Sequence, residues 1–519
     1  MGFARAEAPV EVSPPAVPKL STENALALLV ALGFALRLYL ALTSYCMSGD
    51  GVGFLRMAQE FAVGETKQAL ASVFSPLYPA LVAVVHPLLP NWELAAGLIS
   101  VAAGTAAIAT IFGLTRAIFD RRDLALGAAA IAAFHPDLAA YAASVRTEAG
   151  FTFLTTAALW LIVGGLRRRS IIVLAFAGLV GGLAYLYRTE AIGLLIFIGA
   201  FIPAGAILWR RWNFGWSLVA AAVFSIAFLT VASPYLIFLH SLTGRWSVGR
   251  EFTAAMILGM GNATPNTASW KGLGFSPVAS PFAPVFSNPG LYLLNSARHF
   301  TQSCYGFVQS LGLVLTAFLL AGLWARGRSL AMNFAEALIG LFVVFYLFGF
   351  SLSYTGARFM SHLIPYTFGW VMAGVEAVSI AFAAIAERKQ WPHVPQSALL
   401  VLIIAVMLPR ALWPIGYDQR GLRYAGEQIR NSSPGGTVVA AHDGRVAYYG
   451  NARFVMLPES QTPDLCEWLG LHHASYLLLT DQDETQLRLY NESGCLKPMR
   501  RYPRHGNLYY DLFAVVSPD

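Results

Sequence analysis

Charged residues are scarce in this sequence. Only 12% of the 519 residues are Asp, Glu, Lys or Arg, whereas 56% are hydrophobic, and the mean hydropathy is +0.57. A soluble protein of this length carries about twice that charged fraction. The composition therefore excludes an ordinary soluble protein. Repeated apolar runs of roughly 18–25 residues, each able to cross a ~30 Å hydrocarbon layer as a helix, indicate a polytopic α-helical membrane protein.

Cysteine is also rare, and no CxxC or His/Cys spacing indicates a structural metal. The four cysteines are Cys46, Cys304, Cys466 and Cys495. Cys466 and Cys495 lie in the C-terminal part, where they either pair or remain free thiols. The sequence shows no internal repeat. Residues 1–23 are polar and proline-rich and lack the pattern of a cleaved signal, so we expect a disordered cytosolic tail there.

The net charge of +7 does not indicate nucleic-acid binding. Most of it sits in short arginine clusters between apolar runs, where it reports orientation instead. If every cluster is cytosolic, the chain crosses the membrane about eleven times and its C-terminus lies outside. The clusters are at 119–123, 166–170, 209–212, 324–328 and 386–390. The expected spans are 24–44, 93–118, 124–141, 148–166, 170–187, 190–208, 216–239, 303–323, 332–352, 359–385 and 397–415.

This topology divides the chain into a membrane domain over 24–416 and a C-terminal domain over 417–519. Two outer loops, 45–91 and 240–301, lie on the same side as the C-terminal domain. Residues 75–90, "SPLYPALVAVVHPLLP", form an apolar run that is too short for a span, so we expect a helix along or dipping into the outer surface. The tail alternates helix and strand patterns and predicts a small α/β domain. Its expected helices are "LRYAGEQIRNS", "DLCEWLGL" and "ETQLRLYN", and its expected strands are "TVVAAH", "SYLLLT" and "YYDLFAVV".

Ionisable residues recur at the outer ends of the spans, where they are costly and therefore informative. Each alone is explained by an ion pair or a helix-end anchor, but together they predict a hydrophilic cavity that opens outward. They lie in "GDG" around Asp50, "FHPD" at 134–137, "RTE" at 146–148, "YRTE" at 187–190 and "TGARF" at 355–359. The "HPD" at 135–137 is either a ligand pair or a helix end set by Pro136. Arg37, inside the first span, is interpreted as a structural ion pair or a snorkelling side chain.

The order of these motifs resembles a known family. An acid follows the first span, a "SPLYPAL" surface helix comes next, and "SVRTEAGFTFLTTAALW", "LAYLYRTEAIGLL" and "YTGARFMSHLIPYTFGWVMAGVE" follow in that order. This layout, over roughly residues 24–415, resembles the membrane-integral glycosyltransferases of the C class, which share the GT-C fold. The similarity is to the family 39 superfamily of protein O-mannosyltransferases and lipid A aminoarabinose transferases. The α/β tail also resembles the C-terminal domains of many bacterial members.

The resemblance implies a glycosyltransferase that moves a sugar from a polyprenyl-phosphate carrier to a glycan, lipid or protein acceptor on the outer face. It implies that Asp50 is the base for the acceptor hydroxyl, with glycines on either side that let substrates approach closely. Glu148 is the natural second catalytic acid, and either carboxylate is a candidate ligand of a divalent metal ion. Arginine binds phosphate oxygens with a fork of donors, so Arg188 and Arg358 are the expected donor-phosphate ligands. Further candidates are Arg146, Glu190, Arg298, His299 and Tyr78.

Two other function classes fit parts of the pattern. A secondary transporter also has about a dozen spans and intramembrane charges, but such transporters usually carry inverted repeats and broken helices at mid-membrane. A catalytically inactive relative would keep the layout without the activity. Alanine-rich spans and the preference for arginine indicate a bacterium of high genomic GC. The expected location is then the inner membrane, with the C-terminal domain in the periplasm, membrane lipid around the spans and no nucleic-acid partner.

Overall fold

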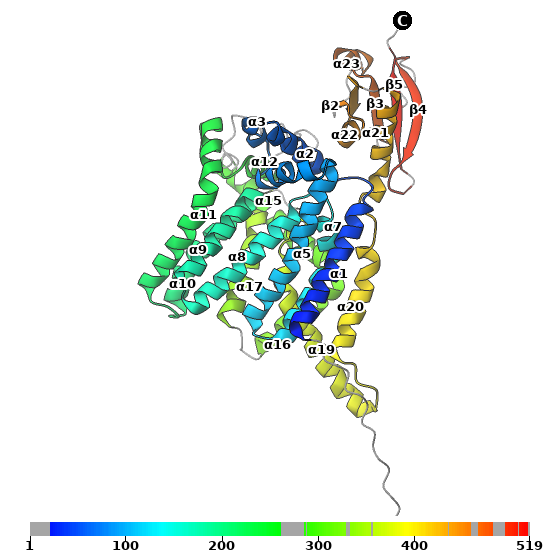
Figure 1. The fold of residues 1–519 in the computed structure, drawn as a ribbon. Helices are drawn as coiled ribbons and strands as arrows, with labels where there is room; N and C mark the ends of the chain where they lie inside the picture. The colour runs from blue at the N-terminus through cyan, green and yellow to red at the C-terminus, as the bar shows by residue number, and fades with distance from the viewer. Residues whose placement is uncertain are drawn as a thin grey trace, which may run out of the picture.

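The computed structural model describes most of the chain as a helical bundle that carries a small mixed domain at one end (Figure 1). The described residues are 21–260, 285–286, 288–328, 333–353, 356–433, 435–457, 465–480, 494–506 and 508–516. The expected tail over 1–20 and the expected helix over 484–491 lie outside them. The helices of the first half are α1 (Thr22–Leu42), α2 (Gly49–Ala62), α3 (Thr66–Leu70), α4 (Leu77–Val85), α5 (Trp92–Phe119), α6 (Arg122–Phe134), α7 (Pro136–Ala142), α8 (Glu148–Arg168), α9 (Ile171–Tyr187), α10 (Ile192–Leu208), α11 (Phe214–Thr243) and α12 (Arg250–Met260).

The second half of the bundle continues with α15 (Pro289–Leu311), α16 (Leu313–Arg328), α17 (Phe334–Ser351), α18 (Ala357–Met360), α19 (Phe368–Lys389) and α20 (Gln396–Ala411). Within the described residues, seven helices are long and apolar enough to cross a membrane, or up to nine if each bent pair is one span. The shorter apolar helices α9 and α20 occupy the two remaining expected spans. The predicted class, a polytopic α-helical membrane protein, is confirmed. The run at 75–90 forms α4 and a short 3₁₀ turn over His86–Leu88.

One expected span is wrong in its geometry. Residues 303–323 do not form a straight helix, because α15 ends at Leu311, directly before Gly312, and α16 leaves it at an angle of 105°. Gly312 has a φ of +85°, a conformation that glycine adopts without steric cost and that ends a helix. The second bent pair, α6 and α7, turns by 59°. Pro136 is the first residue of α7, as expected where a proline cannot continue a helix.

The bend between α6 and α7 explains Arg37. Pro136 has no N–H to offer the carbonyl of Ala132, so the bend leaves backbone oxygens without helical partners. The guanidinium of Arg37 reaches them, with Nη2 donating to Ala132 O at 2.9 Å and Nη1 donating to Ala133 O at 3.0 Å. Arg37 is 1% exposed. The expectation of an ion pair or a snorkelling side chain is therefore wrong: Arg37 replaces lost backbone hydrogen bonds inside the bundle.

Replacing Arg37 by methionine should destabilise the protein. The substitution leaves the carbonyls of Ala132 and Ala133 unsatisfied, at about 1–3 kcal/mol for each group. Removal of the desolvated charge offsets part of that cost. We expect the thermal unfolding midpoint in detergent to fall by several degrees. Arg56→Met, at an exposed site on α2, is the matched control. An Arg37→Met midpoint equal to that control would show that the bend holds without the arginine.

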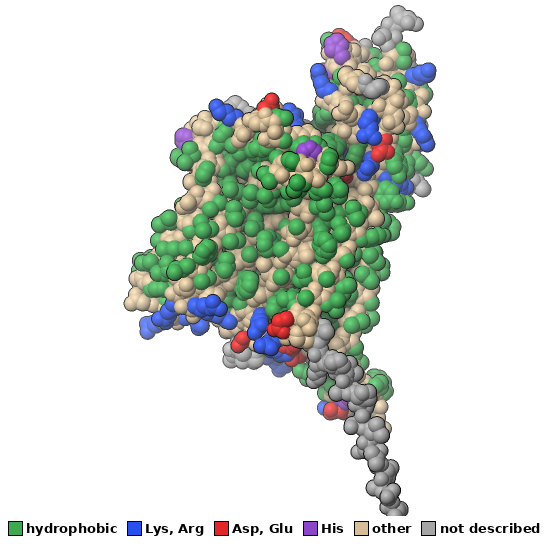
Figure 2. All heavy atoms as spheres, viewed as in Figure 1, with side chains coloured by type: hydrophobic (Ala, Val, Ile, Leu, Met, Phe, Trp, Pro, Cys, Tyr) green, Lys and Arg blue, Asp and Glu red, His purple; other side chains and the backbone are tan. Residues whose placement is uncertain are grey.

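The two ends of the bundle differ in charge. Lys and Arg side chains gather at the lower end in Figure 2, where α8 meets α9 and α10 meets α11, whereas the C-terminal domain is at the upper end. The positive-inside tendency predicts that the lower end is the cytosolic one. We therefore expect a reporter fused after Asp519 to be active only outside the cytosol and an epitope tag at Arg168 to be reached only from the cytosol. An outward-facing tag at Arg168 would overturn this orientation.

The C-terminal domain contains one five-stranded sheet. Its strands are β1 (Val438–Ala441), β2 (Arg453–Met456), β3 (Tyr476–Thr480), β4 (Leu496–Pro503) and β5 (Tyr509–Val515), in the spatial order β2-β1-β3-β5-β4. The pairs β1–β2 and β1–β3 are parallel, and β3–β5 and β4–β5 are antiparallel. In the described part of this domain, three helices accompany the sheet: α21 (Arg420–Ser432), α22 (Arg445–Tyr449) and α23 (Leu465–Leu471). Cys466 and Cys495 form a disulfide, which settles the open alternative.

Most of this domain agrees with the sequence pattern, but three elements were missed. The predicted helices at α21 and α23 and the predicted strands at β1, β3 and β5 are present. The strand β4, "LKPMRRYP", was not predicted because it alternates charges and prolines instead of apolar residues. Such residues are tolerated there because β4 lies at the edge of the sheet. The short elements β2 and α22 also gave no periodic signal.

Candidate active site

Asp50 lies in the first turn of α2, at the upper end of the bundle. The start of this helix is held by Ser48, whose hydroxyl donates to the carbonyl of Val145 at 2.8 Å. On the inner face of α2, Phe54, Leu55 and Ala58 are buried. Gly49 has open space around it and Gly51 packs against Met47. The amphipathic helix therefore points its N-terminal turn toward the segment between α7 and α8.

That segment supplies Arg146 and Glu148. Glu148 is the first residue of α8 and is 6% exposed. The carbonyl of Arg146 accepts a hydrogen bond from Ser100 of α5 at 3.2 Å. This bond holds the backbone that leads into α8. Arg146 Nη1 lies 3.8 Å from Glu148 Oε1. Two side chains at this spacing would diverge on one helix, but Arg146 precedes the helix and the two residues pair.

Arg188 and Glu190 come from the break between α9 and α10. Arg188 has an extended backbone, with φ of −152°, so its side chain leaves the helix and turns inward. Its Nε donates to Glu190 Oε1 at 3.1 Å and its Nη1 donates to Thr147 Oγ1 at 3.0 Å. Nη1 also lies 3.6 Å from Glu148 Oε1. Arg188 is thus a buried cation between two carboxylates.

Arg358 joins the two expected catalytic acids. Gly356 is the N-cap of the short helix α18, which starts at Ala357 and carries the arginine. Arg358 Nη1 donates to Asp50 Oδ2 at 2.6 Å, and Arg358 Nε lies 3.1 Å from Glu148 Oε1. The structure therefore brings together six of the expected site residues, three acids and three arginines: Asp50, Glu148, Glu190, Arg146, Arg188 and Arg358. We call these six residues the ion cluster.

Three further candidates are not part of the ion cluster. The hydroxyl of Tyr78 bonds to Ala96 O at 3.0 Å and to Ser100 Oγ at 3.2 Å, and its ring packs on Phe54 and Tyr187. Tyr78 is therefore a packing residue beneath the site. Arg298 and His299 lie on α15, where Arg298 is exposed. Among the described residues, no ion pair links either of them to the ion cluster.

Glu251 was missed by the sequence analysis. It lies in the first turn of α12, and its electrostatic neighbours are Glu190, Arg188, Asp50 and Arg358. Burial, followed by repulsion from Glu190, raises the pKa of Glu251 well above the usual range of a glutamic acid. The only signal in the sequence is an acid within "VGREFTA", near the start of a long outer loop. Nothing in that pattern indicates that α12 folds back over the ion cluster.

The described donors do not fit a divalent metal ion shared by Asp50 and Glu148. The guanidinium of Arg358 lies between the two carboxylates, where a shared cation would have to bind. Within the described residues, no group of three or more His, Cys, Asp or Glu side chains is placed to hold a metal. Calcium and magnesium sites need several oxygen ligands around one point, and here the acids face arginines.

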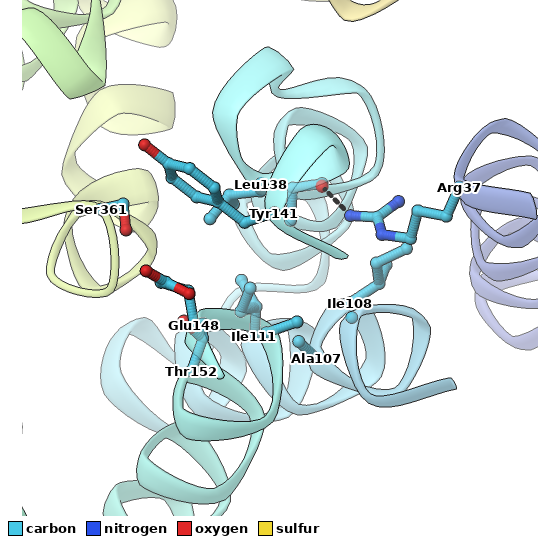
Figure 3. A pocket seen from close by; sticks show the side chains of 12 residues that line it. Arg37, Ala107, Ile108, Ile111, Leu138, Tyr141, Glu148, Thr152 and Ser361 are labelled. Carbon is cyan, nitrogen blue, oxygen red and sulfur yellow. Dashed lines mark hydrogen bonds between the residues drawn. The ribbon is translucent and has the colours of Figure 1, made fainter. Parts of the chain in front are cut away.

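A small cavity of about 20 Å³ lies beneath Glu148 (Figure 3). Tyr141, Glu148, Thr152 and Ser361 form its polar side, and Arg37 lies at the opposite end. A cavity of this size holds about one water molecule. It is too small for a sugar. The ion cluster is accessible on its other side, where Asp50 and Arg358 each keep 32% of their side-chain surface exposed.

Comparison with known proteins supports the resemblance seen in the sequence. Residues 74–238 match the family model described as dolichyl-phosphate-mannose-protein mannosyltransferase. This range is less than half of the chain. It includes Glu148 and Arg188 of the ion cluster, whereas Asp50 and Arg358 lie outside it. No curated protein matches the sequence.

Solved structures show a similar fold over nearly the whole chain. AglB, an archaeal oligosaccharyltransferase from Archaeoglobus fulgidus, solved with an inhibitory peptide and a dolichol-phosphate, has a TM-score of 0.57 at 12% identity, covering 94% of this chain and 74% of that one. ArnT from Cupriavidus metallidurans, bound to undecaprenyl phosphate, has a TM-score of 0.56 at 14% identity, covering 95% of this chain and 99% of that one. The predicted resemblance to GT-C glycosyltransferases is confirmed, and the chain has their fold.

Proposed function

We propose that this GT-C-fold chain is a glycosyltransferase that takes a sugar from a polyprenyl-phosphate carrier and transfers it to an acceptor hydroxyl outside the cytosol. The acceptor is a glycan, a lipid or a protein. The observation that carries the proposal is the position of Arg358, which bridges Asp50 and Glu148 at the end of the bundle that bears the C-terminal domain. A base and a phosphate ligand are thus in contact where a lipid-borne donor and a water-borne acceptor can meet.

In the proposed reaction, the acceptor oxygen attacks the anomeric carbon of the donor sugar. The O–H proton of the acceptor passes to the carboxylate of Asp50, and the bond between the anomeric carbon and the phosphate oxygen breaks. The leaving group is the polyprenyl phosphate, which is a weak base and needs no general acid. It does need positive charge as the bond breaks, and Arg358 and Arg188 supply it.

The contact between Arg358 and Asp50 implies that binding of the donor activates Asp50 as the base. Without a donor, the guanidinium bonds to the carboxylate at 2.6 Å, so this carboxylate oxygen is occupied and does not face an acceptor. A donor phosphate competes for the same guanidinium, since arginine forks onto phosphate oxygens. Binding of the donor then frees Asp50 to accept the proton of the acceptor. The charge-neutral ion cluster would thus become reactive only when it is occupied.

Glu148 has a different role in this proposal from the one expected from the sequence. Its Oε1 lies within 3.8 Å of Arg146, Arg188 and Arg358, and the residue is buried. A carboxylate surrounded by three arginines can neither hold a metal nor reach an acceptor. We assign Glu148 to holding the arginines in place for the phosphate, which lowers the cost of ordering them during the reaction.

Grooves beside the ion cluster support an amphiphilic substrate. A groove of about 150 Å³ between α7, the α15–α16 bend and α20 is lined by apolar residues such as Leu311, Ile403 and Met407. It shares Asp137 and Arg410, which form an ion pair at 2.9 Å, with a second groove of about 360 Å³. The second groove is lined by Tyr141, Trp413 and Arg146 of the ion cluster. An apolar groove that adjoins a more polar groove lined by Arg410 and Arg146 suits a lipid chain with an anionic head.

The test is a donor assay with purified protein in detergent. Polyprenyl-phosphate sugars are offered one at a time, and release of polyprenyl phosphate is followed with a mixture of glycan and lipid acceptors. The proposal predicts sugar release that depends on Asp50. A protein that binds the donor and moves it across proteoliposomes without cleaving the sugar would be a transporter, and that result would contradict the proposal.

A further inference from the structure

The segment leading into α2 is held by the C-terminal domain, although about 400 residues separate the two in the sequence. The N–H of Met47 donates to Tyr449 Oη at 2.9 Å, and the carbonyl of Met47 accepts from Arg445 Nη1 at 3.0 Å. The N–H of Tyr45 donates to the carbonyl of Ile415 at 2.9 Å. The backbone polar groups of this segment therefore have their partners in α22 and in the linker before the C-terminal domain.

Both side chains that hold Met47 are themselves fixed. The hydroxyl of Tyr449 accepts from Met47 and donates to Glu93 Oε1, at the start of α5, at 3.1 Å. Arg445 is 6% exposed; its Nη2 pairs with Asp443 Oδ2 at 2.6 Å and its Nη1 also donates to Gln419. A side chain that is ordered by its own neighbours loses little entropy when it holds another group. The C-terminal domain thus presents a preformed surface to the segment.

Packing follows the same path as the hydrogen bonds. Cys46, Met47 and Phe54 belong to one hydrophobic cluster with Leu422 and Val446 of the C-terminal domain. Gly416, in the linker, has a φ of +68°, and a Cβ at this position would lie 2.2 Å from the carbonyl oxygen of Cys46. Only glycine permits that approach. The segment before α2 and the C-terminal domain therefore form a continuous packed interface.

We infer that the C-terminal domain positions Asp50, and that Tyr449 and Arg445 are positioning residues for the reaction. This inference rests on the proposed function for its effect on activity. Asp50 follows Met47 by three residues, and the other bonds described for the start of α2 run from Ser48 to Val145 and from Arg358 to Asp50. Both of these partners belong to the membrane domain, so releasing Met47 leaves the first turn of α2 without its bond to the C-terminal domain. Misplacement of a reacting group by ~1 Å can cost about 10²-fold in rate.

The test uses Tyr449→Phe in the full-length protein, because phenylalanine keeps the ring and removes only the hydroxyl. Two readouts are measured in a Cys304→Ser background, where Cys46 is the remaining free thiol: the rate of maleimide modification of Cys46 and the steady-state turnover of the donor. Cys46 is 1% exposed, and burial raises its thiol pKa to about 11, so the parent protein should react slowly. Tyr424→Phe, an exposed tyrosine on α21 of the same domain, is the matched control.

We expect maleimide to modify Cys46 several-fold faster in the Tyr449→Phe variant than in the control. We also expect kcat to fall about tenfold, with the donor KM within about twofold of the control value. Arg445→Lys, which keeps the charge and loses the fork, should shift both readouts in the same direction and serves if Tyr449→Phe does not fold. Modification and kcat equal to the control overturn the inference, and so does faster modification with unchanged kcat. The modification rate does not depend on activity, so failure of the proposed function would be recognised separately, by the absence of donor turnover in the parent protein.

Discussion

Asp50→Asn should fold, bind donor and lose at least about 10²-fold in turnover. Asparagine has nearly the same shape as aspartate and can still accept a hydrogen bond from Arg358, so the local structure should survive. It cannot take the proton of the acceptor hydroxyl, and loss of a general base typically costs about 10²–10⁴-fold. The effect should therefore fall on kcat, with the donor KM little changed.

The measurement is donor turnover by purified protein, together with the thermal midpoint and donor affinity. Asp123→Asn provides the matched control, because Asp123 is half-exposed at the opposite end of the bundle, where it pairs with Arg121. Near-normal turnover in Asp50→Asn would remove Asp50 from the mechanism. The acceptor would then need another base from the ion cluster or its neighbours, and Glu251 on α12 would be the next residue to substitute.

Substitution of Arg358 should produce a graded loss. Arg358 is the residue that touches both Asp50 and Glu148, and holding the departing phosphate becomes more favourable as its negative charge develops. Lysine keeps the charge but replaces the two-pronged fork by one ammonium group. We expect Arg358→Lys to retain part of the turnover and Arg358→Ala to lose about 10²-fold or more, as when one donor to a developing charge is removed.

Stability must be measured alongside, because removing Arg358 leaves two carboxylates facing each other without their shared cation. Arg56→Lys and Arg56→Ala are the matched controls, since Arg56 lies on α2 at the same end of the bundle with 74% of its side chain exposed. If both Arg358 variants turn over donor at near-wild-type rates, the arginine is an anchor at the membrane surface and not a phosphate ligand. If turnover falls only in Arg358→Ala, the reaction requires a positive charge at this position and does not require the fork of donors.

The site residues illustrate what a sequence can and cannot predict. Asp50, Glu148, Arg188 and Arg358 were identified because an ionisable residue at the end of an apolar run is costly and therefore conspicuous. Their pairing was not predictable. Arg358 and Asp50 are 308 residues apart, and which acid an arginine contacts depends on how the helices pack. Glu251 was missed for the complementary reason: an acid in a polar loop is ordinary until the loop folds over the site.

Local patterns in the sequence were enough to predict the class of the protein, its approximate number of spans, the arginine-rich end and most of the C-terminal sheet. Each of these follows from local quantities, namely the length of an apolar run, the period of a pattern and the charge of a loop. Three features depend on packing and could not be predicted from local patterns: α15 and α16 bend at Gly312, Arg37 satisfies carbonyls freed by the α6–α7 bend, and α22 holds the backbone before Asp50. These contacts join residues distant in the chain, and a buried polar group takes whichever partner packing brings to it.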